Sequence, residues 1–547
     1  MPAPTTPPVA ARRAALDALT REPFDVLVVG GGITGAGVAR DAAMRGLRTA
    51  LVEKEDFASG TSSRSSRLVH GGVRYLEHGD LRLVFEASNE RRVLRRLAPH
   101  LVRPLAFTWP VYAGARIARW KLAAGLTLYD LLATFRNVAR HERLSAAGVL
   151  RREPRLLSRD LRGGARYWDA LTDDARLTLA TVRSAIASGA TVVNHARVTA
   201  LLREGSRAAG AQVVDELDGG EVRVRARVVV NATGPWSDET ERLAGATTTS
   251  AVHGSKGVHL LVPRARVGNE AALTLLTPQD GRVFFVLPAG DFAVIGTTDS
   301  FEPVSPDEVR ASSGDVAYLI AAANHFFPSA QLTQDDVITA WAGLRPLVAS
   351  DASAGDPGAV SREHAVTERV PGLVRITGGK LTTYRVMARD GVDAVQRSLG
   401  VRVTRSPTAD LPLAGGGLAD PLKVIGAATT LIGDAAVAAR LVHAHGDQWR
   451  EVWAIAEREP ALRERIEPTR PYVMAELRWA VDRELGFTLA DLLVRRIPMA
   501  FETQDHGRAA ARRVAPFVAQ WLGWDSDRRA REVERYDADV ERLFGIE

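Results

Sequence analysis

Two patterns of apolar residues divide this chain. Short continuous apolar runs at residues 26–29, 49–52 and 228–230 have the length expected for strands buried on both faces of a parallel sheet. After residue 413 the pattern changes, because Ala, Leu and Arg then recur with helical periodicity. The pattern predicts an α/β fold built on a parallel sheet, followed by an all-α domain over residues 413–547.

A second group of strand signals lies further along the chain. Residues 282–299, RVFFVLPAGDFAVIGTTD, read as two apolar strands around an Ala-Gly-Asp turn, which is the pattern of a β-hairpin. Residues 257–263, GVHLLVP, read as another strand. These signals predict an antiparallel, β-rich domain inserted into the first one.

The first apolar run leads into a glycine-rich turn. Gly30, Gly32 and Gly35 form G-x-G-x-x-G where a helix should begin, so that backbone can approach a pyrophosphate and the helix N-terminus can bind it. The next strand ends at Glu53, 18 residues after Gly35, where a carboxylate would accept hydrogen bonds from a ribose. Together the strand, turn, helix and carboxylate predict an ADP-containing dinucleotide, without separating FAD from NAD.

Two later segments are typical of chain that wraps a cofactor. Residues 58–77, ASGTSSRSSRLVHGGVRYLE, are rich in Ser, Thr and Gly, although composition alone would equally describe a flexible polar loop. Residues 231–238, NATGPWSD, follow the apolar run 228–230. In two-dinucleotide-binding flavoproteins an Ala-Thr-Gly at this place lies against the cofactor, and the alternative is an ordinary turn at a strand end.

A second glycine-rich segment that resembles a phosphate-binding loop is TGGKLTTYR at residues 377–385. The Walker A motif would need glycine at Val374 and Ser or Thr at Leu381, so this segment does not fit it. We interpret it as the far end of the first site, where a glycine turn opens a helix. If the dinucleotide is a flavin, Lys380 and the helix N-terminus would stabilise the negative charge of its reduced form. The alternative is a Gly-Gly turn that caps a surface helix.

Composition and charge narrow the function classes. The chain has 547 residues, enough for three or four domain-sized units, and no cysteine, which excludes disulfides, thiolate-held iron–sulfur clusters and cysteine nucleophiles. Its net charge of +6 comes from arginines spread along the chain, which favours anionic small molecules or lipid headgroups over nucleic acid. No run of 18 apolar residues and no secretory signal is present, so we expect a cytoplasmic protein.

Several long motifs occur here in the order of one known family. They are GGGITGAGVARDAAMRGL, SSRSSRLVHGGVRYLE, NATGPWSD, GSKGVHLLVP, IGTTD and GGKLTTYR. In these the chain resembles the FAD-dependent glycerol-3-phosphate dehydrogenases, respiratory enzymes that pass electrons to quinone. The resemblance runs from about residue 23 to 400 and continues through residues 480–501, AVDRELGFTLADLLVRRIPMAF.

The resemblance implies a non-contiguous, Rossmann-like FAD domain under an antiparallel cap, and oxidation of sn-glycerol 3-phosphate to dihydroxyacetone phosphate. The expected units are a flexible N-terminal extension at 1–22, an FAD-binding domain at 23–100 with 170–247 and 366–405, a cap at 101–169 with 248–365, and the helical domain. No metal site is expected.

The motifs and the resemblance together assign the cofactor contacts to five stretches of chain. The expected FAD-binding residues are Gly30, Gly32, Thr34, Gly35, Glu53, Thr61, Ser62, Ser65, His70, Gly71, Gly72, Ala232, Thr233, Gly234, Trp236, Gly378, Gly379, Lys380, Leu381 and Thr382.

A phosphate dianion requires fixed positive charge with fork geometry, which arginine supplies. Arg345 lies in an apolar setting, AGLRPLV, and the resemblance implies that it holds the phosphate together with Arg362. The resemblance also implies that Arg74 and Tyr75 face the substrate. Any single arginine in so arginine-rich a chain could equally be a solvated surface residue.

Oxidation of a secondary alcohol removes the hydroxyl proton, so a base should stand beside it. His259, in a cap strand and at a family position, is the expected base, and the alternative is a histidine packed in the core. Thr298 and Asp299 either shape the same pocket or simply end a strand. The expected catalytic residues are thus His259, Lys380 and Arg345.

Residues 115–135 combine basic residues and Trp120 with a series of leucines. They predict either an amphipathic helix at a membrane surface, which would give access to quinone, or a helix packed on its own core. The expected partners are glycerol 3-phosphate, quinone and the inner membrane surface, with a homodimer as an option. Alternative functions are a glycerol-3-phosphate oxidase using oxygen, a flavin amine or amino-acid oxidase, and an FAD protein acting on RNA.

Overall fold

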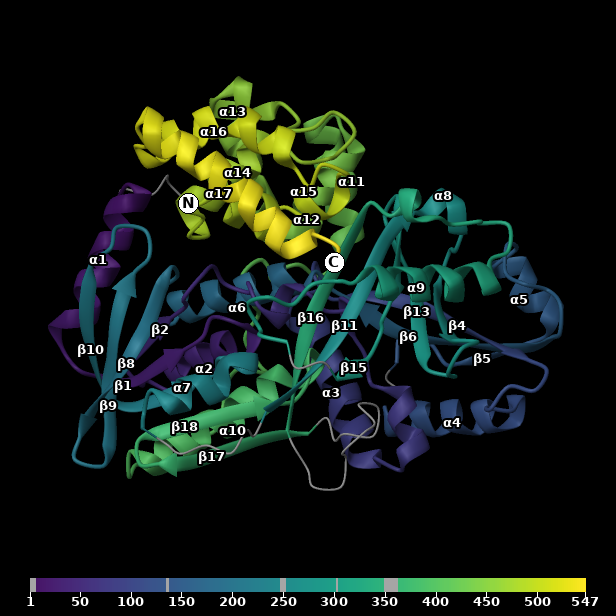
Figure 1. Cartoon of the computed structure of the whole chain (residues 1–547), viewed down its shortest axis with the longest axis horizontal. Helices are drawn as coiled ribbons and strands as arrows, with labels where there is room; N and C mark the ends of the chain where they lie inside the picture. Colours follow the sequence, from purple (N-terminus) through teal and green to yellow (C-terminus); the bar gives the residue numbers. More distant parts are fainter. Residues whose placement is uncertain (1–5, 134–136, 246–251, 302–303, 349–362) are drawn as a thin grey trace.

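A parallel sheet forms the first of two sheets. The computed structural model describes residues 6–133, 137–245, 252–301, 304–348 and 363–547. The sheet has the order β17 (His364–Val370), β18 (Leu373–Gly378), β10 (Glu221–Asn231), β1 (Phe24–Val29), β2 (Thr49–Val52) and β7 (Thr191–Val193) (Figure 1). Along this order all neighbours are parallel except the edge pair β17–β18, and the hairpin β8–β9 (Ala196–Glu204 and Arg207–Asp215) joins the sheet through antiparallel pairing of β9 with β10. The strands predicted at residues 26–29 and 49–52 are confirmed.

Both faces of this sheet are covered, as the continuous apolar runs predicted. Val26 and Val28 of β1 pack into the core beneath the helices α2 (Ile33–Met44), α6 (Asp174–Ala187) and α10 (Tyr384–Ser398). The alternate residues Leu27 and Val29 pack on the other face, because successive side chains of a strand point to opposite sides. That face is covered by α1 (Pro8–Arg21) and the hairpin β8–β9.

Helix α1 corrects the expectation of a flexible N-terminal extension. Residues 8–21 are helical, and Arg12 is buried against the sheet. Its guanidinium donates hydrogen bonds of 2.6 Å to the Asn194 carbonyl and 2.6 Å to the Asp215 carboxylate. The polar start of the chain concealed this helix, because a single buried ion pair and Leu19 carry much of its attachment.

The second sheet is antiparallel except for the pair β12–β4. Its order is β15 (Ser300–Phe301), β11 (Val252–Pro263), β14 (Phe292–Gly296), β13 (Val283–Ala289), β12 (Ala272–Leu276), β4 (Arg103–Tyr112), β6 (Leu161–Leu171) and β3 (Leu68–Val69). In addition, β16 (Thr339–Val348) pairs with β11, and β5 (Glu142–Leu144) with β6. The predicted hairpin is confirmed as β13–β14. We call this unit the cap domain, and the first one the parallel-sheet domain.

Helices cover the cap domain and bridge it to the rest of the chain. One face of its sheet packs on α5 (Ala146–Arg152), α8 (Arg264–Val267) and α9 (Ser313–Phe326). The helices α3 (Leu81–Leu97) and α4 (Arg119–Leu132) lie below it in Figure 1. Within the described residues, no helix combines the length and the apolar character that crossing a membrane requires.

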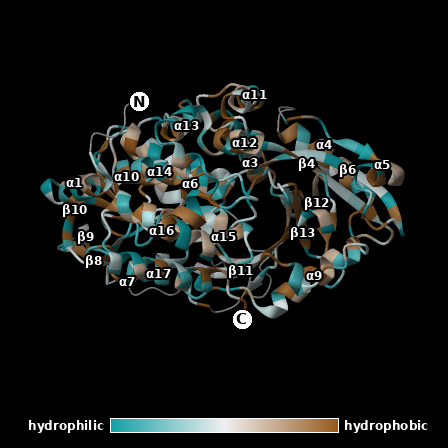
Figure 2. Ribbon diagram, turned by 90° about the horizontal axis from the view of Figure 1, so that it is seen from above, coloured by the Kyte–Doolittle hydropathy of each residue, from teal (hydrophilic) through white to brown (hydrophobic). Residues whose placement is uncertain are grey.

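The C-terminal part is helical, as predicted, and we call it the helical domain. It contains α11 (Pro421–Ile432), α12 (Ala435–His445), α13 (Trp449–Arg458), α14 (Met474–Arg483), the π-helix η8 (Asp491–Arg496), α15 (Met499–Glu502), α16 (Arg508–Leu522) and α17 (Ser526–Phe544). The helical domain lies above the two sheet domains in Figure 1, so in the view from above its helices α14 and α16 are seen over the parallel-sheet domain (Figure 2). The last residue is held on the cap domain, because the Ser313 N–H donates to the Glu547 carbonyl at 2.7 Å.

Candidate functional site

A cavity of about 590 Å³ lies between the parallel-sheet domain and the cap domain. Its wall is formed by the turn after β1, the end of β2, the serine-rich loop before β3, the turn after β10, the strands β11 and β16, and the turn after β18. These segments are far apart in the sequence. Both glycine-rich segments, the one at Gly30 and the one at Gly378, line this single cavity.

The turn after β1 needs glycine for close packing. Gly30 has a φ of +107°, and a Cβ there would lie 2.7 Å from the Ala232 carbonyl oxygen at the end of β10. A side chain on Gly35 would collide with the carbonyl of Gly30, so Gly35 packs helix α2 onto its own strand. Gly32 is the N-cap of α2 and lines the cavity, which leaves the positive end of the helix facing it.

Glu53 stands at the end of β2, beside this turn. Its carboxylate accepts hydrogen bonds from the N–H groups of Gly31 and, at 3.0 Å, of Glu55. Burial raises the pKa of Glu53, because desolvation of the charged form outweighs these two hydrogen bonds. Each oxygen keeps a further lone pair with which it can accept from a ligand hydroxyl.

The serine-rich loop is fixed by its own hydroxyl groups. Ser62 Oγ accepts from the Ile33 N–H at 2.9 Å, which ties the loop to the start of α2. Thr61 donates to the Leu344 carbonyl of β16 at 2.6 Å, and Ser65 donates to the Asp174 carboxylate at the start of α6 at 2.6 Å. The loop therefore connects both sheet domains along one side of the cavity.

The turn after β18 closes the cavity from the opposite side. Gly378 and Gly379 have φ values of +73° and +81°, which only glycine adopts readily. Lys380 caps the short helix that leads into α10, and its ammonium lies 3.6 Å from the centroid of the Tyr75 ring. Thr382 exchanges hydrogen bonds of 3.1 and 3.2 Å with the backbone of His70, so this turn is joined to the loop after β3.

His259 lies on β11 at the cap side of the cavity and is 2% exposed. Its Nε2 is 2.8 Å from Ser66 Oγ, and its ring stacks on Trp341 at 5.2 Å and 11°. Burial, followed by the charges of Arg345 and Arg67, lowers the pKa of His259 to about 3. The imidazole is therefore neutral near pH 7 and able to accept a proton.

Arg345 lies on the neighbouring strand β16 and also lines the cavity. Its guanidinium donates to Thr297 Oγ1 at 2.9 Å and to Ser255 Oγ at 3.2 Å, and forms an ion pair of 3.1 Å with Asp299. These partners hold the fork in one orientation. A side chain at Gly257 would collide with the guanidinium, so glycine at this position of β11 makes room for it.

Comparison with known proteins agrees with this architecture. Residues 25–385 match the family model of FAD dependent oxidoreductases, and residues 406–529 match the C-terminal domain of alpha-glycerophosphate oxidase. A glycerol-3-phosphate dehydrogenase of Mycobacterium leprae is 42% identical over 537 residues, with 97% of this chain and 90% of that protein covered. The aerobic glycerol-3-phosphate dehydrogenase of Bacillus subtilis is 33% identical, with 94% of each chain covered.

A solved structure extends the similarity to three dimensions. The X-ray structure of the glycerol-3-phosphate dehydrogenase from Bacillus halodurans complexed with FAD has a TM-score of 0.80 to this chain, at 31% identity and with 97% of each chain covered. The chain belongs to the FAD-dependent glycerol-3-phosphate dehydrogenase family. The resemblance noted in the sequence is confirmed, and so is FAD as the cofactor.

The cavity fits the FAD of this dehydrogenase family. Its volume is in the usual range of cofactor sites, about 300–1,000 Å³. Its length runs from the N-terminus of α2 and Glu53, which suit a pyrophosphate and a ribose, to Lys380 and His259 under the cap. The tight packing at Gly30 leaves the backbone of the turn open to the cofactor.

Most of the expected dehydrogenase site residues come together in this cavity. Those lining it are Gly30, Gly32, Thr34, Glu53, Thr61, Ser62, Ser65, His70, Tyr75, Ala232, Thr233, Gly234, Trp236, His259, Arg345, Gly378, Gly379, Lys380, Leu381 and Thr382.

Four expected residues are placed elsewhere. Gly35, Gly71 and Gly72 do not line the cavity and instead allow close packing or turns of the backbone. Thr298 also lies outside the lining, because its hydroxyl accepts a hydrogen bond from the Val258 N–H at 3.0 Å. Arg362 and the side chain of Arg74 lie outside the described residues, so their assignment stays a prediction.

Several cavity residues carried no recognisable sequence signal. Ser66 lies in the serine-rich stretch 58–77, but nothing in the sequence indicated its contact with His259, since that contact joins residues 193 positions apart. Another group gathers near Glu53, where Lys54 forms an ion pair of 2.7 Å with Asp307 and lies 4.2 Å from the centroid of the Trp236 ring. The position of Lys54 next to Glu53 was the only available hint, because Asp307 comes from the cap domain.

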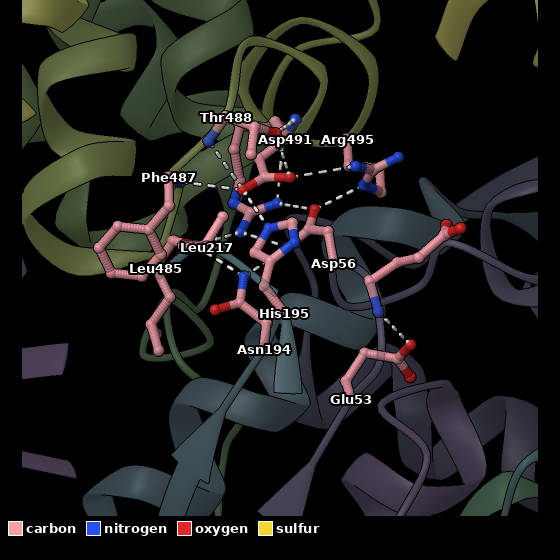
Figure 3. Close-up of polar contacts among 12 residues, drawn as sticks. Glu53, Asp56, Asn194, His195, Leu217, Leu485, Phe487, Thr488, Asp491 and Arg495 are labelled. Atoms are coloured by element: carbon pink, nitrogen blue, oxygen red, sulfur yellow. Dashed lines mark hydrogen bonds and ion pairs between the residues drawn. The ribbon is translucent and has the colours of Figure 1, made fainter. Parts of the chain in front are cut away.

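A polar cluster behind Glu53 joins the parallel-sheet domain to the helical domain (Figure 3). Asp56, His195 and Asp491 bring three possible metal ligands within 4.8 Å of one another. However, the Asp56 carboxylate forms ion pairs with both Arg495 and Arg496. Asp491 accepts from His195 Nε2 at 2.9 Å, and its remaining positions face Arg495 and backbone N–H groups. With arginines supplying the cations, the cluster is an ion-pair network rather than a cage for a metal.

Proposed function

We propose that this protein oxidises sn-glycerol 3-phosphate to dihydroxyacetone phosphate with FAD and passes the electrons to quinone. One observation carries the proposal: the Arg345 fork and the neutral His259 imidazole line the cap end of the same cavity that holds the FAD-binding turn. A phosphate and a secondary alcohol proton are the two groups of the substrate that such a pair would engage. The relatives that carry glycerol-3-phosphate dehydrogenase in their names support the substrate.

Substrate binding is assigned first to Arg345. Its hydrogen bonds to Ser255 and Thr297 and its ion pair with Asp299 fix the guanidinium at the cavity wall, where its positive charge would attract a phosphate. Arg362, Arg74 and Tyr75 are the further substrate-binding residues that we propose on the resemblance. Two or more arginines suit a phosphate dianion better than a carboxylate.

His259 is the proposed base for the hydroxyl proton. Burial, and after it the charges of Arg345 and Arg67, lower the pKa of His259 in the free protein. A phosphate dianion beside Arg345 would offset its charge, so the imidazole would become a stronger base only when substrate is bound. Ser66 keeps the ring orientation through its 2.8 Å contact with Nε2.

Bound FAD supplies the two-electron acceptor, at N5, for the hydride from carbon 2. Lys380 is the proposed stabiliser of the negative charge that reduction leaves on the cofactor. Its ammonium lies over the Tyr75 ring at the cavity wall, so it is held by contact with an aromatic face rather than extended into solvent.

Quinone as the acceptor requires access to a lipid surface, and we propose that α4 with the adjacent α3 provides it. Trp120 and Leu131 of α4 are 70% and 55% exposed, and Leu81 and Phe85 of α3 are 45% and 50% exposed. Basic residues accompany this apolar patch, with the Lys121 ammonium 5.7 Å from the centroid of the Trp120 ring. Apolar side chains interleaved with cations suit an anionic bilayer surface.

One experiment tests both parts of the proposal. The purified holoenzyme is mixed with glycerol 3-phosphate without oxygen, and the visible absorbance of the flavin is followed. We expect the flavin to bleach, and unchanged absorbance would contradict the substrate. The reduced protein is then divided between a quinone analogue and oxygen. Faster reoxidation by the quinone analogue supports a dehydrogenase, whereas faster reoxidation by oxygen with release of hydrogen peroxide would show an oxidase.

A further inference from the structure

His259 is the first member of a stack of side chains that reaches into the helical domain. Its ring stacks on Trp341 of β16 at 5.2 Å, and Trp341 meets Phe501 of α15 edge-on at 5.4 Å and 85°. All three rings are buried, with exposures of 2%, 1% and 4%. Only the Trp341 ring thus separates Phe501 of the helical domain from His259, the proposed base.

Arg67 completes this stack from the serine-rich loop. Its guanidinium lies 4.7 Å from the centroid of the Phe501 ring and 5.4 Å from that of Trp341. Arg67 is also one of the two charged groups, with Arg345, that act on His259. We call Arg67, His259, Trp341 and Phe501 the base-supporting stack.

The backbone holds Arg67 in a conformation that few side chains adopt. Its φ is +56°, in the left-handed region that disfavours non-glycine residues. The conformation is kept by two hydrogen bonds, from the Arg67 N–H to Ser65 Oγ at 3.0 Å and from the Thr172 N–H to the Arg67 carbonyl at 2.8 Å. Strain that the surroundings maintain in this way is typical of a residue placed for function.

Phe501 is anchored firmly enough to act as a support. Its carbonyl accepts a hydrogen bond of 2.7 Å from Thr339 Oγ1, on the same strand as Trp341. On the far side its ring meets Phe544 edge-on at 4.9 Å, and Phe544 stacks on His506 at 5.0 Å. The helical domain therefore contacts β16 next to Trp341, the residue on which the His259 ring stacks.

Two acidic groups also interact with the charge of Arg67. Asp174 and Glu502 are the carboxyl groups on which the Arg67 charge acts, and burial raises the pKa of both. Glu502 also accepts a hydrogen bond of 2.7 Å from the Tyr472 hydroxyl. The aromatic faces of Trp341 and Phe501 are thus the close partners of the Arg67 guanidinium.

We infer that Phe501 is a positioning residue for His259, so that the helical domain sets both the orientation of the proposed base and the charge that faces it. Phe501 acts through Trp341, which supports the imidazole ring, and through Arg67, which it holds against that ring system. The inference rests on the proposed role of His259 in oxidation of the substrate. It gives the helical domain a part in the chemistry, although that domain contributes no residue to the cavity lining.

The test compares Phe501→Leu, which removes the ring, with Phe501→Tyr, which keeps it. Phe517→Leu is the matched control, because Phe517 contacts Trp521 within α16 of the same domain. We expect kcat of Phe501→Leu to fall about tenfold, the order that slight misplacement of a catalytic group costs, with KM and FAD content unchanged. Phe501→Tyr should retain most of the activity, and Phe517→Leu should retain all of it.

A second readout does not depend on the substrate. The protein is labelled with 13C at histidine Cε1, and the His259 signal is assigned with His259→Gln. In the wild type we expect no titration of His259 between pH 5 and 8, since burial, Arg345 and Arg67 lower its pKa to about 3. In Phe501→Leu, and independently in Arg67→Met, we expect a shifted signal and a higher pKa, because water enters or a facing charge is lost.

The kinetic and NMR measurements distinguish an error in the proposed function from an error in the role assigned to Phe501. If glycerol 3-phosphate fails to reduce the wild-type flavin but Phe501→Leu still changes the His259 titration, the proposed function is wrong and the support of His259 by Phe501 stands. An unchanged His259 signal in both Phe501→Leu and Arg67→Met would overturn the inference. An equal loss of kcat in Phe501→Leu and Phe517→Leu would also overturn the inference. Such a result would show that Phe501 stabilises the helical domain without positioning His259.

Discussion

At the residue scale, the proposed substrate end of the cavity depends on a glycine as well as on the side chains that line it. Gly257 on β11 leaves space for the Arg345 guanidinium on β16, and no sequence pattern distinguishes it from other glycines in strands. His259 lies two residues further along the same strand. The orientation of the proposed phosphate-binding fork therefore depends on a position with no side chain.

Gly257→Ala should move that fork. The new Cβ would collide with the guanidinium, so we expect KM for glycerol 3-phosphate to rise about tenfold or more while FAD content stays normal. Gly254→Ala on the same strand is the control, because its Cβ would lie 3.3 Å from the end of the Leu344 side chain, which can give way. Equal KM values in the two variants would contradict this role of Gly257.

Lys380 permits a second test at this scale. Lys380→Met keeps the length of the side chain and removes its charge, so the reduced flavin should lose stabilisation. An interaction of about 1.4 kcal/mol corresponds to about 30 mV for a two-electron couple, and we expect a shift of at least that size to more negative potential. The measurement is dye equilibration during reduction, and an unchanged potential would remove Lys380 from the flavin site.

At the element scale, the positions of strands buried on both faces could be predicted, although the run 228–230 is only the end of the longer strand β10. The apolar runs 26–29 and 49–52 became β1 and β2, because a strand covered on both sides leaves an uninterrupted apolar signal. Helix α1 could not be predicted in this way, since its attachment relies on the buried Arg12–Asp215 ion pair with a partner 203 positions away. The contact of Thr298 could not be predicted for a related reason, because its hydroxyl accepts a hydrogen bond from the Val258 N–H, 40 positions away in the cap sheet.

The helix α4 leads to a prediction at the same scale. Trp120→Glu should abolish cosedimentation with vesicles of anionic lipid, because it replaces the most exposed apolar side chain of the proposed docking patch with a negative charge. Flavin reduction by glycerol 3-phosphate in solution should be unaffected. Leu422→Glu on α11 is the matched control, since Leu422 is even more exposed at 76% but lies outside the patch. Equal binding of the two variants would contradict docking through α4.

At the scale of the whole molecule, buried ion pairs join the helical domain to the parallel-sheet domain. Arg176 on α6 forms a two-pronged pair with Glu484 after α14, with distances of 2.6 and 2.8 Å. Although burial would raise the pKa of Glu484, the charge of Arg176 and its hydrogen bonds lower it. Arg495 and Arg496 hold Asp56 in the same manner, close behind Glu53.

Glu484→Gln should therefore destabilise the whole chain at neutral pH. Removing one partner of a buried pair leaves the other uncompensated, which costs about 3–5 kcal/mol of the free energy of unfolding. Because the folded-state pKa of Glu484 is lowered, its contribution is complete above the unfolded-state pKa, near 4.5, and is lost as the pH falls below that value. Urea unfolding at pH 7 and pH 4 should show a smaller difference between wild type and variant at the lower pH.

The exposed pair Arg405–Asp410 supplies the control for this experiment. Asp410→Asn should change the free energy of unfolding by less than about 1 kcal/mol at either pH, since exposed pairs contribute little. A Glu484→Gln effect as small as this would show that the pair does not join the domains energetically.

The location of the cavity could be predicted from the sequence, but its chemistry at the cap end could be predicted only in part. The spacing of the glycines indicated both turns, and Gly30 and Gly378 line the same cavity. The contacts of His259 with Ser66 and Trp341, however, arise from pairing between distant strands. A single sequence carries no record of such pairing, so neither partner of the proposed base was foreseen.

The most direct measurement compares glycerol 3-phosphate with glycerol, which has the same secondary alcohol but no phosphate. Anaerobic flavin reduction is followed by stopped flow in wild type and in Arg345→Met. In the wild type we expect reduction by glycerol 3-phosphate at far lower concentration than by glycerol, and in Arg345→Met we expect that preference to collapse while FAD stays bound. Wild-type flavin that responds equally to both compounds, or an Arg345→Met variant that keeps the full preference, would contradict the proposed function of this cavity.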